Sequence, residues 1–479
     1  MATKQYPDIV PQGNKTQSLG TNTKKWKELF AGNIVAESIS GDTFAGGLLD
    51  IINTLATKTA LAAVEGEIEN AAAPNYYCED EPFKADTETN HTTIVTPNVL
   101  WLNINNKGHK LLERLSFDIS DPLVWDTKAT LWQAETEYAL GNYVYASSPT
   151  ATYMYICRTP GTSSSLTPTF PTNVGDTYND GSVVWECVLN YAAPANRAGK
   201  DFYIYAIEDT VGNTPTFTVS VNSTVPVGGT EDSTRKVCGF HCLCLSVGTI
   251  AGHKLSGYET GDILPASVWT WAHRPKSEPE GMVYIEGIDM WADIYLASWS
   301  GSYSNTPEDL RLETKYGALC ADGTSAEKFH CLKFEQVYAR QNKRLPRWQE
   351  FVALSIGSNQ GTNVAGGADV NTTGGFKDTA NRRMISDFGC EDCCGNLWQW
   401  GADVGSASTG SASYANYYDA NDKYVGGQTY GAVYRPIFGG AAYSGVVCGS
   451  RSSNWNYAAW PLSWTLGARG LAEPLKRGA

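Results

Sequence analysis

Three short landmarks dominate the C-terminal part of this chain, about residues 430–475. They are Phe438-Gly439-Gly440, then Gly449-Ser450-Arg451-Ser452-Ser453-Asn454-Trp455-Asn456-Tyr457, and finally Leu466-Gly467-Ala468-Arg469-Gly470. The residues between them are largely small or amphipathic types that suit surface contact better than the filling of a core. Glycine adopts positive φ values easily, so Gly439, Gly440, Gly445 and Gly449 predict tight turns. The pattern therefore predicts a stiff frame that carries exchangeable surface residues.

Further motifs lie upstream of these landmarks. Arg344-Leu345-Pro346-Arg347-Trp348-Gln349-Glu350-Phe351 predicts a helix that begins at Leu345-Pro346, with proline at its first position. In Gly395-Asn396-Leu397-Trp398-Gln399-Trp400 we expect a strand whose two tryptophans anchor a core while Gln399 points outward. A second helix is expected from Ser325, as N-cap, to Arg340. Strands are expected at Val268–Trp271, Gly281–Ile285 and Trp291–Trp299.

These motifs resemble two related groups of proteins. The Arg344 helix start, the Gly395–Trp400 motif and the closing Gly467-Ala468-Arg469-Gly470 are similar, in this order, to motifs of formylglycine-generating-enzyme-like domains. The segment at about 430–475 resembles the variable region of phage tropism-determining proteins, whose C-type lectin fold is diversified by retroelements. Both resemblances imply a C-type lectin-like domain at 259–479. The second implies a tail-fibre protein, a homotrimer, that binds a host receptor.

Departures from the enzymes and the sugar-binding lectins favour the receptor-binding group. The enzyme branch needs paired cysteines shortly before the closing motif, but only Cys448 lies there, and Cys393-Cys394 precedes Gly395. Calcium-dependent lectins use Glu-Pro-Asn or Gln-Pro-Asp with Trp-Asn-Asp, and these triplets do not occur. We therefore expect neither catalysis nor a cofactor. An enzyme of the formylglycine-generating type and an invariant structural tail or adhesin protein remain as alternatives.

The resemblance also places the receptor-binding residues. We expect alternation along the strand to bury Trp455 and to expose Asn454 and Asn456, and we expect Trp460 to be a fixed landmark. In the diversified family, variable sites derive from adenine-containing codons, a route by which Trp464 is hard to reach. The expected receptor-binding residues are Ala441, Tyr443, Ser444, Val446, Asn454, Asn456, Tyr457, Ala458, Leu462, Ser463, Trp464 and Thr465. Arg451 and Arg469 are expected to be structural, bonding backbone carbonyls with their fixed donor fork.

Composition limits the partners of the chain. With 36 Lys and Arg against 50 Asp and Glu, its net charge of −14 argues against nucleic acid, whose binding depends on cations. No stretch approaches the ~18 apolar residues that a membrane span needs, and the N-terminus has no apolar signal-peptide region. We therefore expect a virion component made in the host cytoplasm. Its expected partners are a host cell-surface protein or glycan and other virion tail proteins.

The order of patterns along the chain predicts a mostly β protein whose C-terminal domain is α+β. Residues 1–75 read as an N-terminal arm with a helix, which packs either on its own domain or around an oligomer axis. Residues 76–123 and 190–258 read as one β-rich intermediate domain. Between them, 124–189 resembles a small carbohydrate-binding module, in which Trp132 and Trp185 form either a mini-core or a platform for sugars.

The 12 cysteines are expected to be mostly free, buried thiols. Two clusters could instead hold a metal ion, but we favour buried thiols in both. In the first, strand alternation would turn His241 away from Cys242 and Cys244, with Cys238 upstream. In the second, Cys390, Cys393 and Cys394 offer one CxxC spacing without a second pair. Cys157 and Cys187 could be neighbours on adjacent strands.

Overall fold

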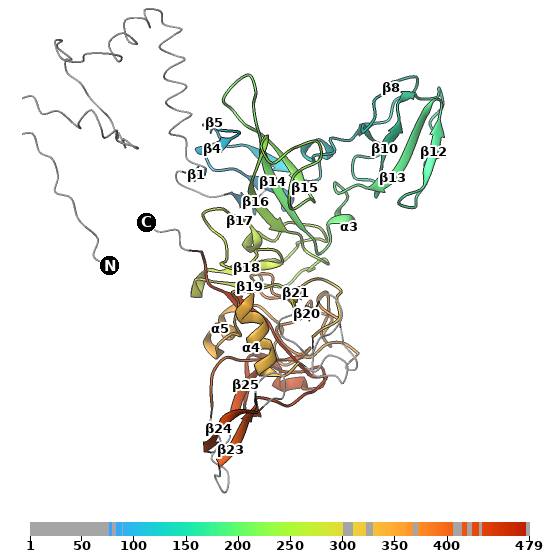
Figure 1. Cartoon of the computed structure of the whole chain (residues 1–479). Helices are drawn as coiled ribbons and strands as arrows, with labels where there is room; N and C mark the ends of the chain where they lie inside the picture. The colour runs from blue at the N-terminus through green and yellow to red at the C-terminus, as the bar shows by residue number, and fades with distance from the viewer. Residues whose placement is uncertain are drawn as a thin grey trace, which may run out of the picture. The chain divides into compact units, whose positions relative to one another are not determined.

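The computed structural model describes residues 76–78, 83–88, 90–299, 310–321, 329–366, 372–405, 414–418, 424–430 and 434–475. The expected N-terminal arm and helix within 1–75, and the proposed N-cap Ser325, lie outside these residues. Within them the chain is mostly β, with few helices, as the sequence predicts (Figure 1).

The first part of the described chain joins short strands from two sequence segments. One sheet has the order β1 (Tyr76–Cys78), β4 (Leu100–Ile104), β5 (Lys107–Leu111), and another has β2 (Lys84–Ala85), β3 (Thr93–Val95), β6 (Ser116–Asp118). A four-stranded sheet has the order β15 (Thr216–Ser220), β14 (Asp201–Ile207), β16 (Thr234–His241), β17 (Trp269–Thr270). Residues of all three sheets share one hydrophobic cluster, so the segments before and after 124–189 pack together.

Strand β14 is buried on both of its faces. Phe202, Ile204 and Ala206 point into the cluster shared with β4. Tyr203 and Tyr205, on the opposite face, pack with Trp269, Met282 and Trp291 of the C-terminal part. Two-sided burial explains the nearly continuous apolar run of this strand. β14 therefore belongs to two cores at once.

Residues 130–189 form a sheet of their own, with strands that lie side by side in Figure 1. Its order is β12 (Thr177–Asp180), β13 (Val183–Leu189), β10 (Tyr153–Thr159), β9 (Tyr143–Tyr145), β7 (Thr130–Leu131), with β8 (Glu137–Tyr138) and β11 (Gly161–Thr162) as a separate pair. Trp132 and Trp185 are buried, and both indole N–H groups donate to Asp180, at 2.8 and 3.0 Å. The mini-core interpretation is therefore confirmed, and a sugar platform on these two residues was wrong.

Buried polar contacts explain how this segment leaves the neighbouring sheets. The guanidinium of Arg197, on the short helix α3 (Pro194–Arg197), donates to the carbonyls of Ile119, Tyr191, Ala192 and Gly261. Ile119 precedes residues 130–189, and Tyr191 and Ala192 follow them. One buried side chain therefore holds the two ends of this segment together. Cys157 faces Trp185 and Cys187 faces Tyr155 across β10 and β13, so the two thiols lie diagonally on adjacent strands and remain free.

The C-terminal part combines two helices with several short sheets. β18 (Met282–Ile285), β19 (Met290–Asp293) and β28 (Leu471–Ala472) form one sheet, and β20 (Ala297–Trp299) pairs with β21 (Leu312–Thr314). A four-stranded sheet has the order β26 (Gly449–Ala458), β25 (Tyr434–Gly439), β22 (Trp398–Trp400), β27 (Leu466–Gly467). β23 (Tyr414–Tyr418) pairs with β24 (Tyr424–Tyr430). Because β28 pairs with β19, the last described strand returns beside the first strands of this part.

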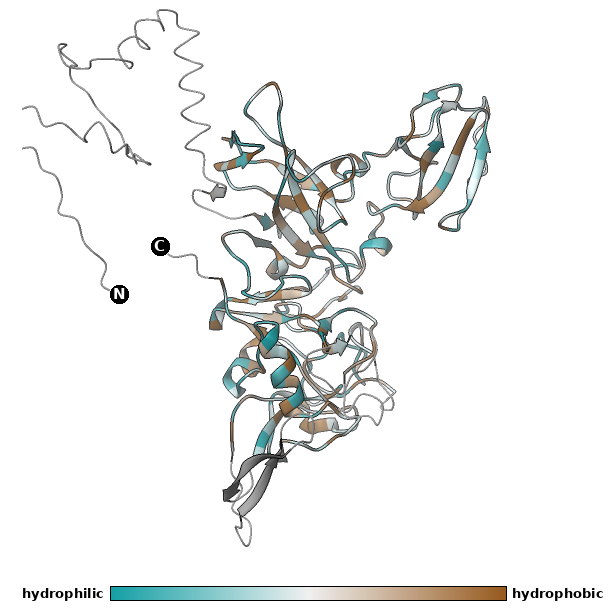
Figure 2. Ribbon diagram, in the orientation of Figure 1, coloured by the Kyte–Doolittle hydropathy of each residue, from teal (hydrophilic) through white to brown (hydrophobic). Residues whose placement is uncertain are grey.

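Both helices begin later than the sequence suggested. Helix α4 spans Cys331–Arg340, because His330 is extended and its ring accepts the N–H of Lys333 as an N-cap. Helix α5 spans Trp348–Leu354, because Arg347 is extended and its N–H donates to the side chain of Glu350 at 2.7 Å. Prolines placed before a cap restrict the chain without joining the helix. Hydrophobic and hydrophilic residues alternate along α4, as Figure 2 shows, and the buried ones face the core.

One strand prediction needs correction, and the pairing of a second strand bears on a domain boundary. The expected strand 291–299 is interrupted at Ile294, Tyr295 and Leu296, which separate β19 from β20. β17, within the expected strand Val268–Trp271, pairs with β16 of the preceding sheet. The boundary at 259 therefore remains a prediction. Among the described residues, no helix combines the length and the apolar character that a membrane crossing requires.

Candidate functional site

The landmarks of residues 430–475 lie on both sides of β22 in the four-stranded sheet, with β25 and β26 toward one edge and β27 at the other. β26 pairs with β25 from Tyr434 opposite Ala458 to Gly439 opposite Gly449. The register shifts between Arg435 and Ile437, where β26 contributes one extra residue beside Pro436. Proline cannot donate to the ladder and occurs in sheets at edges or bulges. The strand at the edge is therefore bulged next to Trp455.

Exposed aromatic side chains concentrate in this segment. Tyr443 is 62% exposed, Trp464 47%, Trp455 42% and Trp460 39%. Among the residues whose burial the structure describes, no other Trp, Tyr or Phe side chain is exposed. We call these four side chains the exposed aromatic set. The rings of Tyr443 and Trp464 contact each other, with centroids 6.1 Å apart. Val446, Val447 and Leu462 of the same segment are also exposed.

The structure leaves ten of the twelve predicted receptor-binding residues at least partly exposed. Tyr443, Val446, Asn456, Leu462 and Trp464 are exposed, and Ser444, Asn454, Tyr457, Ala458 and Ser463 are partly buried. Ala441 and Thr465 are buried, contrary to the exposed positions expected of them. Ala441 forms a bridge with Asn396, and the carbonyl of Thr465 accepts the N–H of Trp398 at 2.9 Å. The backbones of both residues pair with the chain at the start of β22. Both residues therefore belong to the frame.

The tryptophans of this segment show where strict alternation fails. Trp455 was expected to be buried, but the bulge beside Pro436 turns it outward, and its indole N–H donates to Ser453 at 3.0 Å. Trp460 was expected to be a fixed landmark, yet its side chain is exposed. These two side chains are the members of the exposed aromatic set that the sequence reasoning missed. A proline opposite the strand was the available signal of a bulge.

The frame beneath the segment rests on β22. Trp398 and Trp400 contact the same hydrophobic cluster, as predicted from their spacing. Gln399 was expected to point outward but is buried. Its amide donates to the carbonyls of Asp392 and Cys393, and its Oε1 accepts Nε of Arg469 at 3.1 Å. This strand therefore has a covered face on both sides.

The two arginines of the landmarks differ in role. Arg469 is buried and donates to Gln399 and to the carbonyls of Asp293, Ile294 and Glu391, so its structural role is confirmed. Arg451 was also expected to be structural, but its side chain is exposed on β26. A guanidinium on an exposed edge is available for contact with a partner.

Two glycines allow the exposed segment to begin close to the frame. Gly439 and Gly440 have φ values of 91° and 90°. A Cβ atom on Gly439 would lie 2.3 Å from the carbonyl oxygen of Cys393, and one on Gly440 would lie 2.8 Å from Sγ of Cys448. Side chains at these positions would be strained by both the backbone conformation and the close contact. Gly439 is therefore required by the loop before β22, and Gly440 by Cys448 just before β26.

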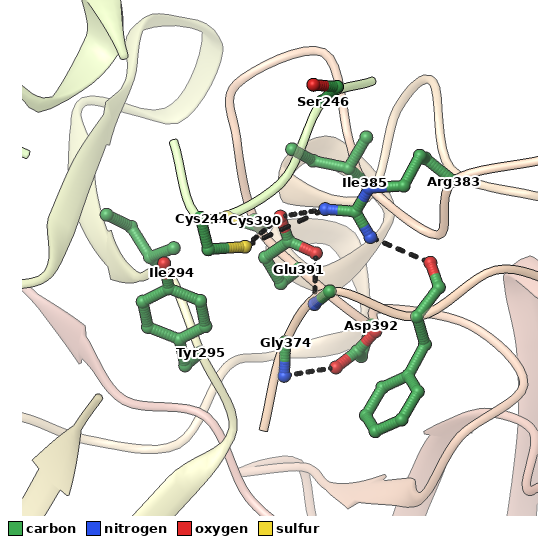
Figure 3. A network of polar contacts seen from close by, with 12 residues as sticks. Cys244, Ser246, Ile294, Tyr295, Gly374, Arg383, Ile385, Cys390, Glu391 and Asp392 are labelled. Atoms are coloured by element: carbon green, nitrogen blue, oxygen red, sulfur yellow. Dashed lines mark hydrogen bonds and ion pairs between the residues drawn. The ribbon is translucent and has the colours of Figure 1, made fainter. Parts of the chain in front are cut away.

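That loop contains a buried network of polar side chains (Figure 3). Glu391 accepts a hydrogen bond from Arg383 at 2.6 Å and one from the thiol of Cys244 at 3.3 Å. Asp392, which has a φ of 55°, accepts the N–H of Gly374 at 2.8 Å. Burial, together with the nearby charge of Glu391, raises the pKa of Asp392 to about 8. At neutral pH this side chain is therefore mainly protonated.

The cysteine clusters take part in packing. All 12 cysteines are free thiols, and all except Cys78 are buried. His241 bonds Asp201 at 2.9 Å and Tyr295 at 3.0 Å. Cys242 joins the first core whereas Cys244 joins another, because the chain leaves β16 at His241; they do not share a strand face. Among the described residues, no group of three or more His, Cys, Asp or Glu side chains is arranged to hold a metal ion.

Comparisons with known proteins connect this geometry to a family. A family model described as the Mtd second domain matches residues 170–270. The tail fiber receptor-binding protein of Bordetella phage BPP-1 is 32% identical over 306 residues, which cover 59% of this chain and 73% of that protein. The chain belongs to this family of phage tail-fibre receptor-binding proteins.

Solved structures agree with that assignment at the level of the fold. The U1 variant of the major tropism determinant has a TM-score of 0.56 and 23% identity, covering 85% of this chain and 87% of that one. The M1 variant has a TM-score of 0.57 and 22% identity, covering 86% and 88%. The expected fold class, mostly β with a C-type lectin-like fold, is therefore confirmed. The relative from phage BPP-1 is named as a receptor-binding protein and not as an enzyme.

The free energy of unfolding should depend on pH because the carboxyl group of Asp392 is buried. A folded-state pKa near 8 lies above the unfolded value of about 3.9. The stability that protonated Asp392 contributes is therefore full below about pH 4 and is lost as pH rises to about 8. Asp392→Asn cannot ionise, and Asn tolerates the positive φ. Relative to this variant, the native chain should lose up to about 1.4 kcal/mol of unfolding free energy per pH unit in that window.

Chemical denaturation of both proteins at several pH values between 4 and 9 measures this difference. A difference that stays constant across the range would show that Asp392 is already ionised in the folded protein.

The contrast between frame and surface can be tested with matched tryptophans. Trp400→Ala removes a fully buried side chain and should lower the free energy of unfolding by about 3–5 kcal/mol. Trp464→Ala removes an exposed one and should change it by less than about 1 kcal/mol. Urea denaturation followed by circular dichroism compares the two. Similar losses in both variants would place Trp464 in the core.

Proposed function

We propose that this chain binds a receptor on the host cell surface through the exposed aromatic set and its polar neighbours. As a member of a tail-fibre family, it is a component of a phage virion. The observation that supports the binding face is the concentration of exposed aromatic side chains in one segment. Tyrosine and tryptophan offer large amphipathic contact areas at a low cost in side-chain entropy, which suits recognition.

The grouping of exposed aromatic and apolar side chains supports a binding role for this segment. Most exposed apolar residues occur singly and have no particular role, but a group of them often marks a binding site. In this chain the group includes Val446, Val447 and Leu462 and lies among Asn, Ser and Arg451. An apolar centre with polar residues at its margin is typical of protein recognition surfaces. We infer a receptor contact that combines aromatic anchors with adaptable polar groups.

The proposal includes a homotrimer attached to other virion tail proteins, as the family resemblance implies. Several copies of one binding face raise the overall affinity through effective concentration, even where each contact is weak. The proposed residues are the predicted set without the buried Ala441 and Thr465, and with Trp455 and Trp460 added.

Adsorption to host cells tests the binding face directly. Tyr443→Ala/Trp464→Ala removes two rings that contact each other. Because aromatic anchors dominate binding energies, adsorption should fall by at least about tenfold. Leu140→Ala/Leu166→Ala, which removes two exposed side chains elsewhere, is the matched control and should leave adsorption unchanged.

Folding and oligomer mass are measured for both variants. Normal adsorption of a folded Tyr443→Ala/Trp464→Ala variant would exclude the exposed aromatic set as the receptor contact.

We further propose that these exposed positions are diversified by a retroelement. The frame residues that hold them, such as Gln399 and Arg469, are buried, so surface exchange need not disturb them. The phage genome should then carry a near-copy of the region encoding about 430–475 beside a reverse-transcriptase gene. Differences between the two copies should fall at template adenines and at exposed positions. Mismatches spread over all four bases would contradict this mechanism and favour an invariant tail protein.

A further inference from the structure

The segment that carries the exposed aromatic set contains a single charged side chain. Arg451 is the only Lys, Arg, Asp or Glu residue between Pro436 and Ala468, and its side chain is exposed. The chain as a whole has 50 acidic and 36 basic residues, so a long stretch without any carboxylate departs from its composition. The segment therefore presents one positive charge, and no negative charge of its own, to a partner.

The sheet register explains why Arg451 extends from β26. β25 and β26 pair at Phe438 with Ser453 and next at Gly439 with Gly449. Residues 450–452 therefore lie opposite no residue of β25. Extra residues in one strand bend it and redirect its side chains. Within the part of the chain that the structure describes, the guanidinium of Arg451 has no hydrogen-bonding or ion-pair partner.

The residue before Arg451 is held in place by three hydrogen bonds. The hydroxyl of Ser450 donates to the carbonyl of Ser355, at the end of α5, at 2.8 Å. It also accepts Nε2 of Gln360 at 2.8 Å, and the N–H of Ser450 donates to Oε1 of Gln360 at 3.2 Å. The backbone at the base of Arg451 is thus restrained, although its side chain is not. A restrained backbone lowers the entropy that a contact through this side chain would cost.

Arg451 lies near the exposed aromatic set along the same strand. Trp455 follows four residues later, so the two Cα atoms are at most about 14 Å apart even in a fully extended chain. Both side chains are exposed. An interface of ordinary size that covers one of them also reaches the other. Tryptophan and arginine are the residue types that contribute most often to binding energy in protein interfaces.

The apolar residues of the segment favour a protein over a glycan as the partner. Val446 is 87% exposed, Val447 57% and Leu462 44%. Such aliphatic groups gain free energy against an apolar protein surface, whereas sugar hydroxyl groups placed on them would lose hydrogen bonds to water. Carboxylates, which are strong acceptors for hydroxyl groups, do not occur between Pro436 and Ala468.

We propose that Arg451 pairs with a carboxylate group of a protein receptor, on a surface that otherwise presents apolar groups to the exposed aromatic set. This inference rests on the proposed function and names the chemistry of its partner. A guanidinium can bind a carboxylate through two parallel hydrogen bonds, so this contact also fixes the orientation of the receptor. Because the net charge of the chain is −14, an extensively acidic receptor would be repelled, and the carboxylate therefore lies among neutral groups.

Adsorption to host cells tests the proposal with a series of charges at one position. Arg451→Lys keeps the charge but loses the paired donors, and adsorption should weaken by about threefold. Arg451→Gln should weaken it by about tenfold or more, and Arg451→Glu further still, because two carboxylates then face each other. Lys128→Gln removes an exposed cation that is distant in sequence, and as the matched control it should adsorb like the native chain. Raising NaCl from about 0.05 to about 0.5 M should weaken native adsorption more than that of Arg451→Gln.

Thermal unfolding and oligomer mass are measured for each variant and should match those of the native chain. Equal adsorption of native, Arg451→Gln and Arg451→Glu chains would overturn the ion pair. If Tyr443→Ala/Trp464→Ala still loses adsorption in that assay, the proposed function stands without this contact, and if it does not, both fail. A lower oligomer mass in Arg451→Gln would overturn the proposal by assigning the charge to a contact between copies.

Treatment of the host cells distinguishes the class of receptor. Digestion with proteinase should abolish adsorption of the native chain. Periodate, which cleaves the vicinal diols of sugars, should leave it unchanged. Loss of adsorption after periodate but not after proteinase would overturn the protein receptor in favour of a glycan.

Discussion

The guanidinium of Arg469 is the interaction on which the C-terminal part most depends. It is fully buried and bonds the carbonyls of Asp293, Ile294 and Glu391 as well as the side chain of Gln399. A buried cation is tolerated only when its donors are satisfied, and removal of its partners is costly. These bonds join β19, the loop before β22 and β22 itself. Two segments that are distant in sequence, 293–294 and 391–399, are thereby fixed to one group.

The position of the exposed segment follows from this constraint. The loop held by Arg469 presents the carbonyl of Cys393 to Gly439, where no side chain would fit. The chain can therefore turn sharply into residues 441–448 and return along β26. Buried bonds define the path of the backbone, while Tyr443, Val446 and Trp464 extend from it into solvent. In the proposed function, receptor recognition and folding are carried by different atoms of the same segment.

The sequence predicted the structure correctly at positions where a residue type has one physical reason to occur. The spacing of Trp398 and Trp400, the glycines at 439 and 440, and the donor fork of Arg469 each led to a correct expectation. It was less informative where a partner distant in sequence decides. Gln399 is polar, yet the carbonyls of a neighbouring loop and Arg469 bury it. Trp455 follows the alternation rule in sequence, but the bulge opposite Pro436 reverses it. The start of α4 depends on His330 as a cap, a role that histidine seldom indicates from sequence.

The bulge between β25 and β26 has a further consequence for the behaviour of the protein in solution. β26 is the outermost strand of its sheet, and such a strand with apolar side chains is a ready template for lateral aggregation. An extra residue beside Pro436 breaks the regular ladder, and the charge of Arg451 lies on the same strand. Together they oppose the addition of a strand from a neighbouring molecule. An edge strand beside exposed aromatic side chains is in this way protected from lateral association with another copy.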